Sequence, residues 1–443
     1  MTALNGAPAG NGGVGHQANQ RKGTTQWLRS RSERMIQVAG APGAAREVAT
    51  VATTPVQEAS RLNSIFESCR EITQDVEFSV AKQWLAEKPG RKAIGCFPIY
   101  CPVELIHACG MLPLGIIGAG NQIEITYADS RFQSFVCSIV KSTLELGFTK
   151  RLEFVEGMLF HSICDPARNL GAVFFRNFPG RFVDYIHYPQ NFASPLGIGY
   201  LEKEYQRILN ALQERAGYKP TAEDLNRSIQ LYNRIRAALR ELYRLRSEKP
   251  HLISAAEQFV LTRAGTLMPP EKNLEMLEEV LAELPTRSTR PKDRIRVVLE
   301  GSFCELPPVA LIETIEEAGC YILDDDFLRG WRWFTQDVPI EANPLHAMAE
   351  SYSERAYYSG TKHDSREVKS AHLIKMAQDH KADAVIIMAA KFCEPALFDY
   401  ALYRKALDDA KIPHLLLEFE EKTWIFDRAR SEAETFVESL LFD

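Results

Sequence analysis

The chain has 443 residues, of which 45% are hydrophobic and 25% are charged, with 26 glycines and 23 prolines. This is an ordinary globular composition, and it excludes collagen-like, coiled-coil and wholly disordered chains. The net charge of −6 makes nucleic acids and anionic membrane surfaces poor partners, and the length predicts two or three domains.

The sequence predicts a cytoplasmic protein with reduced thiols. No apolar run approaches the roughly 18 residues that a membrane helix needs. The first residues, MTALNGAPAGNGG, lack a cationic segment followed by an apolar one, so we expect no export signal. Nine cysteines spread over the chain do not fit a disulfide scaffold. They are therefore core residues, catalytic groups or metal ligands.

The first 58 residues read as a flexible extension with one short helix near Gln26–Val38. Residues 59–200 alternate between short apolar runs and helical patterns, which predicts an α/β domain with a parallel sheet. Its expected strands are Lys92–Phe97, Leu112–Ile117, Gly157–Ile163 and Val183–Tyr188. Its expected helices are Val103–Cys109, Ser134–Leu146 and one that starts at Cys164-Asp165-Pro166.

Residues 201–290 are rich in Glu, Arg, Leu and Ala at helical spacing, so we expect long helices broken at Pro220, Pro250 and Pro269-Pro270. Residues 291–443 return to alternation and predict a second α/β domain. Its last helix is expected to start at Ser431, where Ser431 and Glu434 have capping-box spacing. The fold class is therefore two doubly wound parallel-sheet domains with a helical segment between them.

Cysteines recur just after predicted strands, where open α/β sheets bind ligands. These are Cys101, Cys164, Cys304 and Cys393. A sulfur at a helix N-terminus is favoured as thiolate, the form that binds iron–sulfur clusters. Cys137, by contrast, falls inside a predicted helix. Because cysteine is often simply buried, core packing is the alternative for each of them. Four others are expected in the core, namely Cys69, Cys96, Cys109 and Cys320.

Several common motifs are missing from the sequence. It contains no P-loop, no G-x-S-x-G and no H-E-x-x-H. The glycines of residues 115–120 have the wrong spacing for a nucleotide loop and predict a plain turn. Core or surface roles are favoured over catalytic ones for the remaining polar and aromatic candidates. These are His107, His161 and the aromatic group Trp331, Trp333 and Phe334, and the acidic run Asp324–Asp326 is expected to be a solvated strand end rather than a cation site.

Four segments together resemble the 2-hydroxyacyl-CoA dehydratase and benzoyl-CoA reductase family. Residues 100–113, YCPVELIHACGMLP, resemble the family signature Y-x-P-x-E-[LI]-[IL]-x-A-x-G-x-x-P. The others are FVCSIVK around Cys137, SICD around Cys164 and AKFCEP around Cys393, and Pro413 and Glu418 also keep the register. The resemblance runs from about residue 90 to the last residue.

The resemblance implies one [4Fe-4S] cluster held by three cysteines from separate loops, and it selects Cys137 over Cys164 and Cys304. The implied ligands are Cys101, Cys137 and Cys393, with Cys96 as the alternative first ligand. Many dehydratases have a cysteine four residues before the motif proline, whereas this chain has Pro98 there. That departure favours the benzoyl-CoA reductase branch, and the length resembles the larger of its two catalytic subunits.

The resemblance further implies ATP-driven reduction of an aromatic acyl-CoA ring to a cyclic diene. The implied partners are a homologous catalytic subunit, ATP-hydrolysing iron–sulfur activator subunits, reduced ferredoxin and the acyl-CoA substrate. Two alternatives remain open: a 2-hydroxyacyl-CoA dehydratase subunit that recycles its electron, and a cluster-free structural partner subunit.

Overall fold

The structure is a computed structural model. It describes residues 61–98, 100–191, 194–301, 305–325, 327, 336–355, 368–420 and 425–442. The chain divides into two compact units, Met1–Gln57 and Glu58–Asp443, and every described residue belongs to the second. Several predictions fall outside the described residues: the extension over 1–58 with its short helix, Cys304, Asp326 and the aromatic group Trp331, Trp333 and Phe334.

The first half holds a four-stranded parallel sheet in the order β2-β1-β3-β4. Its strands are β1 (Ala93–Cys96), β2 (Leu112–Gly115), β3 (Gly157–His161) and β4 (Phe182–Ile186). Three of them are buried at every residue, as expected for a parallel sheet covered on both faces. The helices after these strands are α3 (Val103–Ala108), the 3₁₀ turn η1 (Ala128–Arg131), α4 (Ser138–Phe148), α5 (Asp165–Asn177) and α6 (Leu196–Ala216).

The second half repeats this plan with a parallel sheet in the order β6-β5-β7-β8. Its strands are β5 (Ile295–Glu300), β6 (Cys320–Asp325), β7 (Ala384–Ala390) and β8 (His414–Phe419). The helices of this half are α10 (Val309–Glu317), α11 (Pro344–Arg355), α12 (Lys369–Asp379), α13 (Glu394–Ala410) and α14 (Asp427–Phe442). The predicted fold class of two parallel-sheet α/β halves is confirmed.

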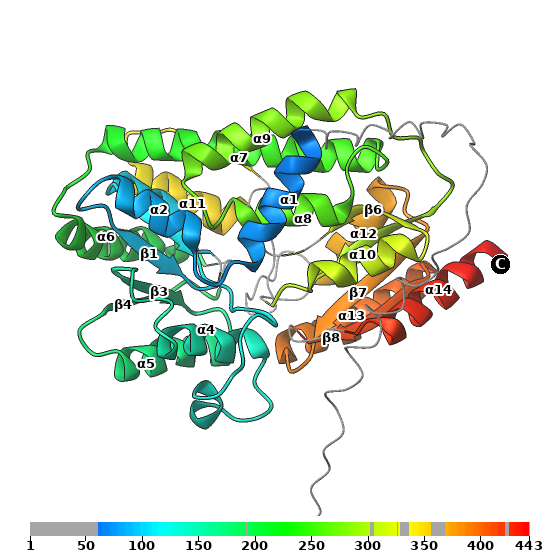
Figure 1. The fold of residues 1–443 in the computed structure, drawn as a ribbon, viewed down its shortest axis with the longest axis horizontal. Helices are drawn as coiled ribbons and strands as arrows, with labels where there is room; N and C mark the ends of the chain where they lie inside the picture. Colours follow the sequence, from blue (N-terminus) through cyan, green and yellow to red (C-terminus); the bar gives the residue numbers. More distant parts are fainter. Residues whose placement is uncertain are drawn as a thin grey trace, which may run out of the picture. The chain divides into compact units, whose positions relative to one another are not determined.

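The predicted helical segment is present between the sheets in the chain. Together with two helices from the start of the unit, it comprises α1 (Arg61–Gln74), α2 (Ser79–Glu87), α7 (Ala222–Glu248), α8 (Ala255–Ala264), α9 (Pro270–Glu283) and the 3₁₀ turn η2 (Leu284–Thr286). The breaks fall at the predicted prolines, and capping boxes at Thr221 and Ser254 start α7 and α8. Figure 1 shows α7 and α9 side by side, and α1, α7, α8 and α9 share an apolar cluster that includes Phe66 and Leu277.

Two predicted helix starts are wrong. The helix predicted from Ser134 begins at Ser138, so Cys137 is its N-cap residue. The last helix begins at Asp427 rather than Ser431.

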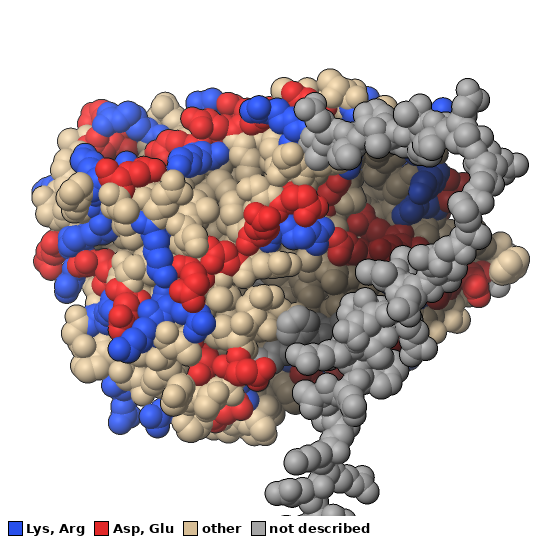
Figure 2. Space-filling view, in the orientation of Figure 1, with Lys and Arg blue, Asp and Glu red and all other residues tan. Residues whose placement is uncertain are grey.

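On the surface, acidic and basic side chains are mixed over the face shown in Figure 2.

Candidate functional site

Both sheets have a topological switch point where ligands of open α/β proteins bind. In each half the first strand is second in the order, so the connections diverge between β1 and β3 and between β5 and β7. The segments that leave these carboxyl ends carry Cys101 after β1, Cys164 after β3, Glu305 after β5 and Cys393 after β7. The candidate site is therefore built on the two switch points.

Three cysteines occupy equivalent local positions. Cys137, Cys164 and Cys393 are the N-cap residues of α4, α5 and α13. Cys137 and Cys393 are each 5% exposed, and Cys164 is half-buried. Each sulfur therefore belongs to the residue at which a helix presents its unpaired N–H groups and the positive end of its dipole.

The same three thiols act on one another. Burial raises the pKa of the Cys137 thiol well above its ordinary value, and the negative charges of Glu305, Cys164 and Cys393 act in the same direction. Burial is the largest of these influences, so the Cys137 thiol is not made acidic by its place at a helix N-terminus. The charges of Cys164 and Cys393 thus reach Cys137 although the three residues are far apart in the sequence. Because three thiolates would repel one another, the thiols can all be deprotonated only when a positively charged group lies among them.

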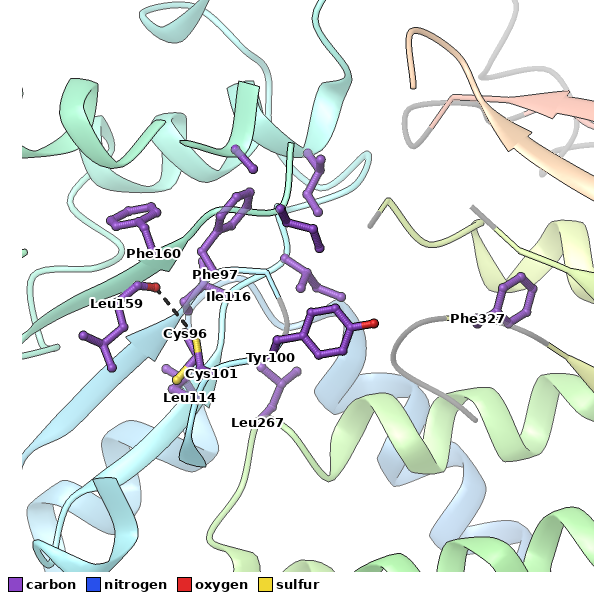
Figure 3. Close-up of a cluster of buried hydrophobic side chains, with 14 of the residues drawn as sticks. Cys96, Phe97, Tyr100, Cys101, Leu114, Ile116, Leu159, Phe160, Leu267 and Phe327 are labelled. Atoms are coloured by element: carbon purple, nitrogen blue, oxygen red, sulfur yellow. Dashed lines mark hydrogen bonds between the residues drawn. The ribbon is translucent and has the colours of Figure 1, made fainter. Parts of the chain in front are cut away.

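Cys101 has different surroundings. It directly precedes Pro102, the N-cap residue of α3, and is 1% exposed. Its Sγ lies 3.9 Å from the carbonyl oxygen of Leu159. Cys96 and Cys101 lie together in Figure 3 and line a cavity of about 100 Å³ between the edge of the first sheet and the helical segment. The cavity beside Cys101 is therefore formed by the first sheet and the helical segment.

The ligand chemistry of the three thiols is compared with that of a single metal ion and that of an iron–sulfur cluster. Among the residues that the structure describes, no three His, Cys, Asp or Glu side chains are placed to hold one metal ion. In a [4Fe-4S] cluster each thiolate binds a different iron, so the sulfurs stand further apart than ligands of a single ion. The chemistry of Cys137, Cys164 and Cys393 therefore matches what a cluster requires of its protein ligands.

Glu305 is a site residue that the sequence reasoning missed. Its carboxylate accepts a hydrogen bond from Ser138 Oγ at 2.5 Å and one from the Ile139 N–H at 3.3 Å. It is 2% exposed. A residue that follows β5 in the second half thus binds the start of α4 in the first half. The only available sequence signal was an acidic residue placed between a strand and a proline-initiated helix.

A group of buried aromatic side chains lines the carboxyl edge of the first sheet. Tyr188 packs against Tyr352 with ring centroids 4.3 Å apart, and both contact Tyr100 or His161 edge-on. The Tyr188 hydroxyl donates a hydrogen bond to the Tyr100 carbonyl oxygen. In Figure 3 the Tyr100 ring points away from the sulfurs of Cys96 and Cys101, towards the side on which Phe327 lies. These rings keep water from this part of the site.

A larger cleft of about 430 Å³ lies beside this edge. Its walls include the glycine turn, Arg263 and Leu306. Gly118 and Gly120 have φ angles of 79° and 54°, which agrees with the predicted turn. Leu306 is the residue after Glu305, and the Glu305 carboxylate contacts the start of α4. The cleft therefore extends to the neighbourhood of α4. Among the described residues, its lining combines apolar side chains and backbone with the ionisable side chains of Arg263 and Asp75, which suits an elongated ligand with polar and apolar parts.

The other polar candidates have structural roles. His107 bonds Ser228 Oγ and Glu271 Oε1, each at 2.9 Å, which supports the structural interpretation. The expectation of a solvated strand end at Asp324–Asp326 is wrong for the two described residues. Asp324 and Asp325 are 5% and 3% exposed, and the buried Arg246 guanidinium lies 2.8 Å from Asp325.

The four cysteines predicted in the core are buried. Burial raises the pKa of Cys69, Cys109 and Cys320 to about 12, so these thiols stay protonated. They are poor ligands and poor nucleophiles.

A family model described as "2-hydroxyglutaryl-CoA dehydratase, D-component" matches residues 98–440. This chain belongs to that family. The match covers the segments that follow β1, β3, β5 and β7, and it includes every cysteine discussed as a ligand except Cys96. The family resemblance inferred from the four sequence segments is confirmed.

Three curated relatives match nearly their whole length. A subunit of benzoyl-CoA reductase from Thauera aromatica is 36% identical over 85% of this chain and 98% of its own. The beta subunits of (R)-phenyllactyl-CoA dehydratase from Clostridium sporogenes and (R)-2-hydroxyglutaryl-CoA dehydratase from Acidaminococcus fermentans are 27% and 28% identical, each over 86% of this chain and 100% of their own. All three are subunits of enzymes named for acyl-CoA compounds.

Among the helices that the structure describes, none combines the length and apolar character needed to cross a bilayer.

Proposed function

We propose that this chain is one subunit of an ATP-dependent enzyme that reduces an aromatic acyl-CoA ring to a cyclic diene, as a benzoyl-CoA reductase does. The observation that carries this proposal is the 36% identity to a benzoyl-CoA reductase subunit, against 27% and 28% to two dehydratase subunits. The proposed partners are a homologous catalytic subunit, ATP-hydrolysing iron–sulfur activator subunits and reduced ferredoxin. The sequence has no P-loop, which agrees with ATP hydrolysis on another chain.

We infer that Cys137, Cys393 and a third cysteine hold a [4Fe-4S] cluster. The electrostatic influence of Cys164 on Cys137, beside that of Cys393, supports Cys164 as the third ligand. Cys101, which the sequence motif implies as a ligand, remains the alternative to Cys164. Cys96 is in turn the alternative to Cys101. When bound, such a cluster supplies a one-electron carrier, and three protein thiolates leave one iron open to another ligand.

The surrounding residues have three roles in this proposal. The N-termini of α4, α5 and α13 direct positive dipole ends towards the thiolates, which stabilises their negative charge. The aromatic group around Tyr100 and Tyr188 excludes water, and low polarity strengthens every electrostatic interaction inside. The cleft beside Leu306 offers space for an extended acyl-CoA.

A dehydratase subunit is the second candidate, because the family model and two of the relatives carry dehydratase names. The two activities differ in electron balance, since a dehydratase recycles its electron and a reductase consumes two electrons for each ring. The third candidate, a partner subunit without a cluster, predicts no iron on this chain.

The test is product analysis with the purified complex under anaerobic conditions. We expect benzoyl-CoA to yield a cyclic diene with steady consumption of two electrons per product. Water loss from a 2-hydroxyacyl-CoA without net electron consumption would instead establish the dehydratase. Absence of iron and acid-labile sulfide on the chain would leave the structural partner.

The ligand set is tested by single serine variants. We expect Cys137→Ser, Cys164→Ser and Cys393→Ser each to lose iron and the cluster's electron paramagnetic resonance (EPR) signal. Cys320→Ser is the matched control, because this thiol is buried in β6 and is not a proposed ligand. If Cys101→Ser loses the cluster and Cys164→Ser keeps it, the third ligand is Cys101.

A further inference from the structure

Glu305 joins the two halves of the described unit at one of the proposed cluster ligands. Ser138 and Ile139, which donate its two hydrogen bonds, are the two residues that follow Cys137. Cys137 is the N-cap residue of α4 but makes no side-chain cap hydrogen bond. The cap of α4 is therefore supplied by Glu305 from another part of the chain.

The Glu305 carboxyl lies where the start of α4 presents hydrogen-bond donors. A helix N-terminus stabilises an anion through its dipole and its N–H groups, and the Ser138 hydroxyl adds a further donor. The carboxylate is 2% exposed, so solvent screens its charge weakly. Its charge also reaches the Cys137 thiol.

A fixed negative charge beside an electron carrier opposes the arrival of an electron. The effect is Coulombic, and it is large where the surroundings are dry. Local charge and hydrogen bonding near the sulfurs are among the factors that set the reduction potential of an iron–sulfur cluster. Reduction of an aromatic ring requires electrons of very low potential, so a device that lowers the potential serves that reaction.

We propose that Glu305 is a positioning residue that holds the Cys137 end of α4 and, through its negative charge, lowers the reduction potential of the cluster bound there. This inference rests on the proposed function, because it requires a cluster at Cys137. Glu305 would thus be a residue outside the ligand set that affects the driving force for electron transfer from the cluster.

Glu305→Gln separates charge from shape. Ser138 and Ile139 donate to different oxygens of the carboxylate, so in the glutamine the amide oxygen accepts from the Ile139 N–H and the amide N–H₂ donates to the Ser138 hydroxyl, while the negative charge is lost. Glu316→Gln is the matched control, because Glu316 accepts bonds from the N–H groups of Ala255 and Ala256 at the start of α8. The pKa of Glu316 is raised to about 7, so the comparison is made above that pH, where the control carboxyl is ionised.

The readout is the midpoint potential of the full chain, from a redox titration followed by EPR. We expect Glu305→Gln to shift the midpoint to a more positive value, and Glu305→Asp and Glu316→Gln to stay near wild type. Glu305→Met is the second neutral variant should the glutamine variant bind no iron. An unchanged midpoint in a neutral variant with full iron content overturns the inference and leaves the cluster proposal intact.

Two further outcomes are decisive. If both neutral variants lose iron while Glu305→Asp keeps it, the residue is needed for cluster retention, and the claim about the potential is overturned. If wild-type chain contains no iron, the proposed function fails first, and that result is separate from any midpoint shift.

Discussion

Replacement of Arg246 should reveal how strongly this fold depends on one buried ion pair. Arg246 is 1% exposed in α7, and its guanidinium lies 2.8 Å from Asp325 Oδ2 and 4.0 Å from Asp324 Oδ1. The guanidinium also lies over the Tyr243 ring, 4.6 Å from its centroid, and the Tyr243 hydroxyl donates to Asp325 at 3.0 Å. His380 binds the other carboxylate, Asp324, at 2.8 Å.

Arg246→Met keeps most of the side-chain volume but leaves the Asp325 carboxylate without its cation. Loss of one partner of a buried pair costs about 3–5 kcal/mol, because the remaining charge stays desolvated. Burial already raises the pKa of Asp325, and Arg246 opposes that rise. Without Arg246 the pKa rises further, the carboxyl takes up a proton more readily, and the loss of stability shrinks as the pH falls.

Urea unfolding followed by tryptophan fluorescence, at a pH near neutral and at an acidic one, measures both effects. Arg244→Met is the matched control on the same helix, because this side chain is 49% exposed and pairs only with surface glutamates in its described contacts. We expect little change there. Arg246→Met with Asp325→Asn should recover part of the lost stability. A loss below about 1 kcal/mol that is the same at both pH values would refute the reasoning.

Three further predictions concern stability. Burial raises the pKa of Glu316 from 4.5 to about 7, so the folded chain holds this proton to higher pH than the unfolded chain. This proton stabilises the folded chain fully below about pH 4.5, and the stabilisation is lost as the pH rises to about 7. Over this pH range the free energy of unfolding, measured with urea, should fall by roughly 3 kcal/mol from this group, and Glu316→Gln should abolish that fall. An added Cβ at Gly157 would meet the Phe182 carbonyl oxygen at 2.1 Å, so Gly157→Ala should lower the Tm, whereas Gly199→Ala, with nothing within 4 Å, should not. Thr221→Ala should cost about 1 kcal/mol through the lost cap of α7, and an unchanged midpoint of unfolding would contradict the role of that cap.

The sequence by itself determined the α/β alternation, because apolar runs, prolines and glycines record local backbone preferences. It also determined the helical segment, whose breaks lie at the predicted prolines. The rule that sulfur at a helix N-terminus is functional selected Cys101, Cys164, Cys304 and Cys393. It missed Cys137 only because Phe135 and Val136 extend the apolar pattern before the true start of α4 at Ser138.

Only the tertiary structure decided which distant groups meet. The start of α4 is capped by Glu305, which lies 167 residues from Ser138 in the sequence, so no local pattern contains it. From the sequence alone, Asp324–Asp325 is predicted to be solvated. In the fold, Arg246, which lies 79 residues before Asp325, packs beside this run. Similarly, Cys137, Cys164 and Cys393 act on one another only because two parallel sheets bring their carboxyl edges together. Local sequence sets how each segment folds, whereas the packing of apolar faces sets which polar groups the segments bring into contact.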